Sequence, residues 1–129
     1  MRLEIQRRFS DLDPLGHVNN VAYHDYLQEA RMGLISDLDA VVNDDYAMVV
    51  VSQEIRHVKP LEYSRKPVVI ETRVTDMART SYSIVYRVLD EKGDIAAEAT
   101  TRLAVVDPVS GRPIRMPESL RERLAAAGE

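Results

Sequence analysis

Cysteine and tryptophan are both absent from this chain of 129 residues, and phenylalanine occurs only once. Without cysteine the chain forms no disulfide, no thiolate metal site and no cysteine nucleophile, so we expect a cytoplasmic location. The scarcity of large aromatic side chains also leaves few surfaces on which nucleobases can stack.

Long hydrophobic runs and blocks of one charge are missing as well. No apolar stretch approaches the ~20 residues that cross a bilayer. The alternating N-terminal segment carries Glu4 and does not resemble a signal peptide. The net charge is −4, and lysine and arginine are spread along the chain without a basic block. We therefore expect no membrane or nucleic-acid partner, whereas a few local arginines suffice to bind a small anion.

The composition that remains, with 45% apolar and 29% charged residues, is typical of a soluble globular protein. No repeat or linker divides residues 1–129, which we take as one domain. Apolar residues recur at helical spacing over residues 20–38 and predict a long helix with Asn19 or Asn20 as its N-cap. Alternating or β-branched segments predict strands at residues 2–9, 47–58, 68–77, 80–89 and 95–106, and a short helix is expected at 117–127.

The four later strands follow one another largely through short turns, so we expect them to pair antiparallel. One face of this sheet is apolar, and the other carries Glu54, Arg56, Glu71, Arg73, Glu98 and Arg102. A sheet with one apolar face needs one covering layer, and only the helix at residues 20–38 is long enough to supply it. The prediction is an α+β domain whose strands curl around one helix.

The most informative stretch is the bend at residues 10–18, between the first strand and the long helix. In it Asp13 is followed by a stiff proline and a flexible glycine, and the first N–H groups of the helix lack partners within it. A carboxylate beside such donors can attack a carbonyl or activate water while the donors hold the oxyanion. An Asp before a Pro is also a common turn residue, and the sequence leaves open whether Asp11 or Asp13 acts.

The histidines and serines give weaker signals. His17 is either a general acid/base or a residue that caps and packs the start of the helix, and the second interpretation is favoured. His24 and His57 have no partner at the spacing of metal ligands, and no Gly-x-Ser-x-Gly elbow is present. We expect neither a metal ion nor an organic cofactor.

The bend and the helix after it resemble a sequence block of hotdog-fold acyl-CoA thioesterases, closest to the 4-hydroxybenzoyl-CoA thioesterase family. The resemblance is carried by Asp11-Leu12-Asp13-Pro14-Leu15-Gly16-His17-Val18-Asn19-Asn20, followed by Tyr23, Tyr26, Glu29, Ala30 and Arg31. Weaker matches continue in order at Val49-Val50-Val51-Ser52, Arg79-Thr80-Ser81-Tyr82, Ala97-Glu98-Ala99, Val106-Asp107 and Gly111-Arg112-Pro113. The resemblance therefore covers essentially the whole chain.

This resemblance implies a curved five-stranded antiparallel sheet around one central helix, with a short C-terminal helix. It also implies a homodimer whose sheet continues across the interface, or a homotetramer, with the active site between subunits. In the family the second acid of the motif is catalytic, which is Asp13 here. Backbone N–H groups at the helix start would polarise the thioester carbonyl, at Val18, Asn19, Asn20 and Val21.

Plant acyl-carrier thioesterases resemble the block too, with an asparagine two residues after the acid and a histidine two residues beyond. Here the histidine position is His17, but the asparagine position is Leu15, so an Asn/His mechanism is not carried over. The resemblance leaves open whether Asp13 acts as a nucleophile or as a general base, and which acyl chain is accepted.

We predict an enzyme that hydrolyses an acyl-CoA thioester to a carboxylic acid and CoA without a cofactor, because a thioester is already an activated acyl donor. Tyr23 is assigned to substrate binding. Arg65, Lys66 and Arg79 are candidates for the CoA phosphates and are equally consistent with solvated surface charges.

Two alternatives compete with this prediction. Hotdog hydratases and dehydratases resemble Asp-x-Asn-Pro-x-His, with the histidine five residues after the first acid, whereas Asp11 and His17 are six residues apart. A binding module for acyl-CoA without turnover is the second alternative, and the presence of Asp13 argues against it.

Overall fold

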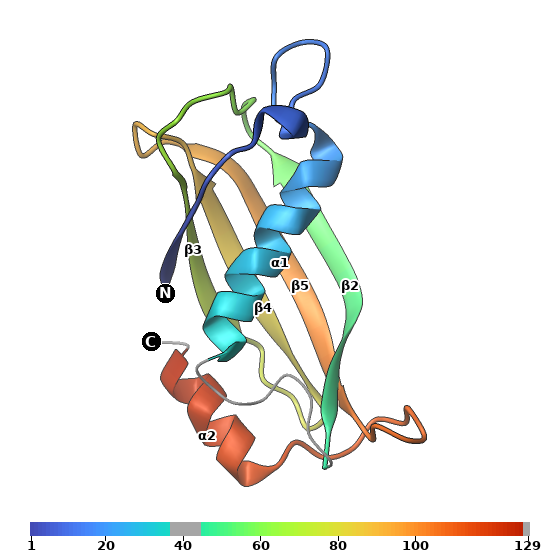
Figure 1. Cartoon of the computed structure of the whole chain (residues 1–129). Coiled ribbons are helices and arrows are strands. Elements are labelled where there is room, and N and C mark those ends of the chain that lie inside the picture. The colour runs from blue at the N-terminus through green and yellow to red at the C-terminus, as the bar shows by residue number, and fades with distance from the viewer. Residues whose placement is uncertain (37–44, 128–129) are drawn as a thin grey trace.

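A computed structural model describes residues 1–36 and 45–127 of the chain. Five strands form one antiparallel sheet in the order β1-β3-β4-β5-β2. They are β1 (Arg2–Ile5), β2 (Ala47–His57), β3 (Val68–Thr75), β4 (Ser81–Leu89) and β5 (Ile95–Val106). The long helix α1 (Asn20–Ser36) lies along one face of the curved sheet, and the short helix α2 (Glu118–Ala127) lies near its C-terminal end (Figure 1). The expected α+β architecture is confirmed.

The core lies between α1 and the inner face of the sheet. The helix buries one stripe at the predicted spacing: Ala22, Tyr23, Tyr26, Leu27, Ala30, Leu34 and Ile35. Alternate residues of β3 and β4 are buried against it: Val68, Ile70, Thr72 and Val74, then Tyr82, Ile84, Tyr86 and Val88. Each fully buried apolar side chain contributes about 1.5–3 kcal/mol, so this core holds the strands around the helix. The expected last turn of the helix, at residues 37–38, lies outside the described residues.

The first strand is shorter than predicted. β1 ends at Ile5, four residues before the predicted end at Phe9, and Phe9–Asp11 form a turn of 3-10 helix at the start of the predicted bend. The cause is local, because Oδ2 of Asp11 accepts the backbone N–H of Arg8 at 3.0 Å and offers the chain an alternative to strand pairing. The other strands match their predicted bounds within two residues; β3 ends early because Asp76 turns the chain with a φ of 51°.

The register of the strands separates the two ends of the sheet. Ile5, the last residue of β1, pairs with Val68, the first residue of β3. The bend at residues 9–19, which follows β1, therefore lies at the same end of the sheet as the loop at 58–67, which precedes β3. The turn at residues 76–80 lies at the other end, near α2 (Figure 1). No helix among residues 1–36 and 45–127 is long and apolar enough to span a bilayer.

Candidate active site

The bend before α1 folds back on itself as a short hairpin. Leu12 and Val18 form an isolated antiparallel bridge, and the N–H of Asp13 donates to the carbonyl of His17 at 2.8 Å. Gly16 closes the turn with a φ of 79°, a conformation that glycine adopts without steric cost. The hairpin therefore holds Asp13 opposite His17, shortly before the helix begins.

The carboxylate of Asp13 is oriented by this turn. Its Oδ1 accepts the backbone N–H groups of Leu15 at 2.9 Å and of His17 at 3.1 Å. No hydrogen bond or ion pair within the described part of the chain engages Oδ2, and the side chain is partly exposed. A carboxylate with one oxygen fixed and the other free can attack an electrophile or accept a proton from water.

Asn19 is the N-cap of α1, which confirms one of the two predicted caps. Its Oδ1 accepts the backbone N–H of Ala22 at 2.9 Å. The side chain thereby satisfies one of the N–H groups that a helix leaves without internal partners, and it fixes the direction in which the remaining ones point.

Two of the four backbone N–H groups predicted to hold an oxyanion are already engaged. Val18 donates to the carbonyl of Leu61 at 2.7 Å, and Asn19 donates to the carbonyl of Asp11 at 2.8 Å. Both bonds tie the hairpin to its surroundings, so these two groups serve the fold. The N–H groups that have no partner among the described residues are those of Asn20 and Val21.

The other carboxylate of the bend is fully engaged. Asp11 is 3% exposed, and it accepts the hydroxyl of Tyr26 at 2.6 Å and pairs with the guanidinium of Arg8 at 2.9 Å. Burial raises the pKa of Asp11, but the hydrogen bonds from Tyr26 and Arg8 outweigh it and hold that pKa below its ordinary value. Burial and the bond to Asp11 raise the pKa of Tyr26. Asp11 is therefore a structural partner, and Asp13 is the carboxylate with a free oxygen.

Tyr23 is buried in the core beside the helix start. Burial raises the pKa of Tyr23 to about 12. Its ring packs edge-on against His57, with 4.7 Å between ring centroids. His57 is exposed at the end of β2, so it lies at the same end of the sheet as the bend. No pattern in the sequence indicated this neighbour, because the two residues are brought together only by packing.

The loop that follows β2 forms a wall beside the bend. His17 pairs with Glu62, and the buried guanidinium of Arg7 donates to the carbonyls of Glu62 at 2.8 Å and Lys66 at 2.7 Å. Arg65 is exposed on this loop. The structure thus brings two predicted phosphate-binding residues, Arg65 and Lys66, to the end of the sheet that holds Asp13.

Arg79 does not join these residues within one chain. It lies in the turn between β3 and β4, where its carbonyl accepts the N–H of Met116 at 2.8 Å. β3 has 8 residues and rises about 3.4 Å per residue, so Arg79 lies roughly 25 Å or more from the end that carries the bend.

A polar network that the sequence pattern did not predict crosses the core between α1 and the sheet. The hydroxyl of Tyr86 donates to Thr101 at 2.9 Å, and Thr101 donates to the side chain of Gln53 at 2.8 Å. Gln53 in turn contacts His24 at 2.5 Å, and Arg31 donates to the Tyr86 hydroxyl at 3.3 Å. Arg31 is half-buried and turned toward the sheet. Polar residues at inward positions of β2 and β5 were the available signal.

No cluster of three or more His, Cys, Asp or Glu side chains suited to a metal ion occurs in the part of the chain that the structure describes. The site consists of one oriented carboxylate, two unengaged N–H groups at a helix start and a basic loop. A curved five-stranded sheet around one long helix, with this bend at the start of the helix, is the arrangement of hotdog-fold proteins that act on thioesters.

The chain belongs to the thioesterase-like superfamily, whose family model matches residues 7–124. The protein named "Putative acyl-CoA thioesterase YneP" of Bacillus subtilis (strain 168) is 28% identical over 116 residues, which cover 87% of this chain and 83% of that protein.

Two solved structures are similar to this chain along nearly its whole length. A thioesterase from Thermus thermophilus, complexed with coenzyme A and Zn, has a TM-score of 0.85 and 31% identity, covering 98% of this chain and 93% of that one. The PA5185 protein of Pseudomonas aeruginosa strain PAO1 has a TM-score of 0.87 and 26% identity, covering 100% of this chain and 92% of that one.

Proposed function

We propose that this protein hydrolyses an acyl-CoA thioester to a carboxylic acid and coenzyme A. The observation that carries the proposal is the carboxylate of Asp13, whose Oδ1 is fixed by two backbone N–H groups while Oδ2 stays free. The unengaged N–H groups of Asn20 and Val21 support it, because negative charge develops on the thioester oxygen during the reaction. Membership of the thioesterase-like superfamily and the thioesterase relatives support it as well.

Two chemical routes are open to Asp13. As a nucleophile, Oδ2 attacks the thioester carbonyl carbon, the C–S bond breaks, and CoA leaves as a thiolate that takes up a proton; water then hydrolyses the mixed anhydride and restores the carboxylate. As a general base, Oδ2 takes a proton from a water molecule whose oxygen attacks the same carbon; the C–S bond then breaks, and CoA leaves as a thiolate that takes up a proton. In both routes the N–H groups of Asn20 and Val21 would stabilise the oxyanion. Label in the Asp13 carboxyl group after a single turnover in ¹⁸O-labelled water would identify the nucleophilic route, in which water opens the mixed anhydride at the aspartyl carbon.

The CoA moiety is assigned to the basic loop beside the bend. Arg65 and Lys66 can pair with its phosphates, and the relative complexed with coenzyme A supports this class of ligand. His17 is assigned to the scaffold, because its backbone holds both Asp13 and Glu62.

A homodimer through the free edge of β2 would complete the site. β2 is the last strand of the sheet, and Val49, Val50 and Val51 along it are 44%, 48% and 63% exposed. An edge of this kind can pair with another strand. Antiparallel pairing of two β2 strands would turn the Arg79 end of one copy toward the Asp13 end of the other, as an active site between subunits requires.

The experiment that tests the function is an assay on a panel of short aliphatic, long aliphatic and aromatic acyl-CoA esters, together with an enoyl-CoA. Released CoA is measured with a thiol reagent, which is free of background because the protein has no cysteine. Hydrolysis of at least one ester is expected. Binding of CoA esters without release of thiol would favour the binding module, and hydration of an enoyl-CoA without thiol release would favour the hydratase; either result would overturn the proposal.

A further inference from the structure

The single phenylalanine of the chain lies on the surface, in contact with an exposed tyrosine. Phe9 is 78% exposed in the 3-10 turn that opens the bend, and Tyr63, on the loop after β2, is 43% exposed. Their rings meet edge to face, with 5.9 Å between centroids and 74° between ring planes. Aromatic rings contribute most when they are buried, so a pair held open to solvent is available to stack on a ligand.

The backbone that carries the two rings is held in place by hydrogen bonds. The N–H of Leu12 donates to the carbonyl of Phe9 at 3.2 Å, which closes the 3-10 turn. On either side of Tyr63, the carbonyls of Glu62 and Lys66 accept the buried guanidinium of Arg7 at 2.8 and 2.7 Å. The ring pair is therefore preorganised, which lowers the entropy lost when a ligand binds.

Two cations lie beside the ring pair. Arg65 and Lys66 follow Tyr63 by two and three residues, and both are exposed. Their backbone groups are bonded, but neither side chain makes a hydrogen bond or ion pair within the described part of the chain. The aromatic surface is thus bordered by positive charge that no carboxylate of the described residues neutralises.

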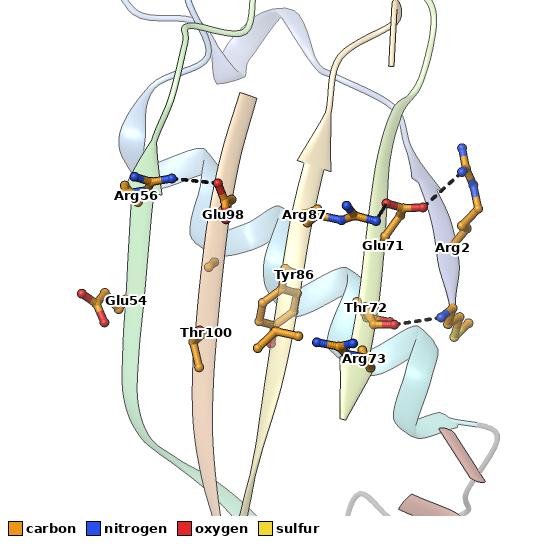
Figure 2. Close-up of a pocket in the computed structure, with 13 residues that line it drawn as sticks. Arg2, Glu54, Arg56, Glu71, Thr72, Arg73, Tyr86, Arg87, Glu98 and Thr100 are labelled. Carbon is orange, nitrogen blue, oxygen red and sulfur yellow. Dashed lines mark hydrogen bonds and ion pairs between the residues drawn. The ribbon is translucent and has the colours of Figure 1, made fainter. Parts of the chain in front are cut away.

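Arginines on the outer face of the sheet, the face turned away from α1, show the contrast. Ion pairs there join Arg56 to Glu98 at 2.8 Å and Arg87 to Glu71 at 2.8 Å, beside a hollow of about 740 Å³ (Figure 2). A phosphate that binds such an arginine must displace or approach a carboxylate. The cations next to the ring pair can bind an anion without that competition.

The ring pair lies near the proposed active site. Phe9 precedes Asp13 by four residues, so at most about 14 Å separates their Cα atoms. Tyr63 comes two residues after Leu61, whose carbonyl accepts the N–H of Val18 in the bend at 2.7 Å. A CoA ester whose carbonyl lies at Asp13 can therefore reach the ring pair with the far end of its flexible pantetheine arm.

That far end of CoA carries an adenine base and phosphate groups. We propose that Phe9 and Tyr63 form a stacking site for the adenine of an acyl-CoA, beside the cations assigned to its phosphates. The inference rests on the proposed function for the identity of its ligand. An acyl chain suits the ring pair less well, because it is buried best in an apolar pocket, whereas exposed rings bordered by cations match a flat, anionic group.

Binding of adenosine 3′,5′-bisphosphate, the nucleotide portion of CoA, tests the site without a thioester. Isothermal titration calorimetry measures its Kd for the natural chain, for Phe9→Leu and for the control Phe9→Tyr, which keeps a ring. Phe9→Leu is expected to raise the Kd at least about fivefold, and Phe9→Tyr to keep it within about twofold. Because Phe9 is exposed, neither substitution disturbs the core. A natural chain that does not bind the nucleotide, or an unchanged Kd in Phe9→Leu, would overturn the proposal.

A pair of substrates separates nucleotide binding from catalysis. One acyl group is presented as its CoA ester and as its pantetheine ester, which lacks the nucleotide. In Phe9→Leu the KM for the CoA ester is expected to rise at least about fivefold while kcat stays within about twofold, and kcat/KM for the pantetheine ester to stay within about twofold.

The two substrates also distinguish this proposal from the thioesterase assignment. Equal losses of kcat/KM on both esters in Phe9→Leu would place the effect on the fold of the bend, which contradicts the stacking site and leaves the thioesterase assignment intact. Nucleotide binding that depends on Phe9, with no ester hydrolysed, would support the stacking site and contradict the thioesterase assignment.

Discussion

The charged carboxylate of Asp11 joins the bend to α1 by accepting the hydroxyl of Tyr26, so its contribution to stability depends on pH. The folded chain holds the pKa of Asp11 below its ordinary value, so this contribution is fully present above the unfolded pKa of about 3.9. It is lost as the pH falls through the lower, folded pKa, because the protonated acid can no longer accept its full set of bonds. We expect the free energy of unfolding to decrease with acid in this range, and to do so less steeply in Asp11→Asn.

Urea unfolding between neutral and acidic pH measures this effect. Tyr26→Phe removes the hydroxyl that donates to Asp11 and is expected to cost about 2 kcal/mol at neutral pH. Asp90 and Asp107 also have lowered pKa values, so part of the acid dependence persists in Asp11→Asn. An Asp11→Asn curve parallel to that of the natural chain would show that the charge of Asp11 does not matter.

Arg7 is a buried cation whose bonds go to the backbone of the loop beside the bend. It is 4% exposed and donates to the carbonyls of Glu62 and Lys66. Arg7→Met keeps the bulk of the side chain but leaves both carbonyls without these donors, which is expected to cost about 1–3 kcal/mol. Thermal unfolding measures this loss of stability. If the KM for acyl-CoA rises by a larger factor than kcat falls, the substitution acts mainly on substrate binding by the loop that carries Arg65.

At the level of elements, the start of α1 depends on one side chain. Asn19→Ala removes the cap on the N–H of Ala22 and is expected to cost about 1 kcal/mol, whereas Asn19→Asp keeps an acceptor and should stay near the natural stability. Chemical denaturation of both variants measures the difference. Equal losses in Asn19→Ala and Asn19→Asp would show that the cap is not what holds this end of the helix.

The elements were largely predictable from periodicity. β5 has the predicted bounds, and the buried stripe of α1 follows the spacing of Tyr23, Tyr26 and Ala30. The 3-10 turn at Phe9–Asp11 was not predictable, because it depends on where the carboxylate of Asp11 finds its donors. Local bonds of this kind compete with strand pairing, and the alternation of apolar and polar residues does not indicate them.

The roles of the candidate site residues stay predictions from the motif around Asp13, and the hydrogen bonds of these residues could not be predicted from the sequence. The motif around Asp13 indicated the carboxylate and the helix start. Which oxygen of Asp13 is free, and that Val18 and Asn19 have already used their N–H groups, follows from contacts with Leu61 and Asp11. Long-range packing sets these contacts, so spacing along the chain could not reveal them.

For the whole molecule, we expect a homodimer through the β2 edge. Val51→Lys places a charge on this edge, a substitution that discourages strand pairing, and is expected to shift the protein toward monomer and to lower activity. Val109→Lys is the matched control, since Val109 is 97% exposed in the turn after β5 and should change neither property. Light scattering gives the mass. An unchanged mass and rate in Val51→Lys would exclude this edge as the interface.

The arrangement of charges on the outer face of the sheet was the least predictable part of the described structure. The sequence indicated a charged outer face, with Glu54, Arg73 and Glu98 among its residues. The alternation across strands becomes visible only in the register, because neighbours such as Arg87 and Glu98 come from different strands. Pairing between strands is a property of the folded sheet, so the spacing of residues along the chain does not reveal it.

We propose that the free oxygen of Asp13 performs the chemistry of this protein. Asp13→Asn keeps an Oδ1 that accepts the N–H groups of Leu15 and His17, so the fold should survive. Asp107→Asn is the control, because Asp107 precedes a proline and its Oδ1 accepts two backbone N–H groups in the same way, at the end of the sheet opposite the bend of its own chain.

The decisive measurement is kcat for the best acyl-CoA substrate in these two variants, with circular dichroism to verify folding. We predict that kcat falls about a thousandfold in Asp13→Asn and stays within about twofold of the natural value in Asp107→Asn. A folded Asp13→Asn protein that hydrolyses the thioester at the natural rate would contradict the account.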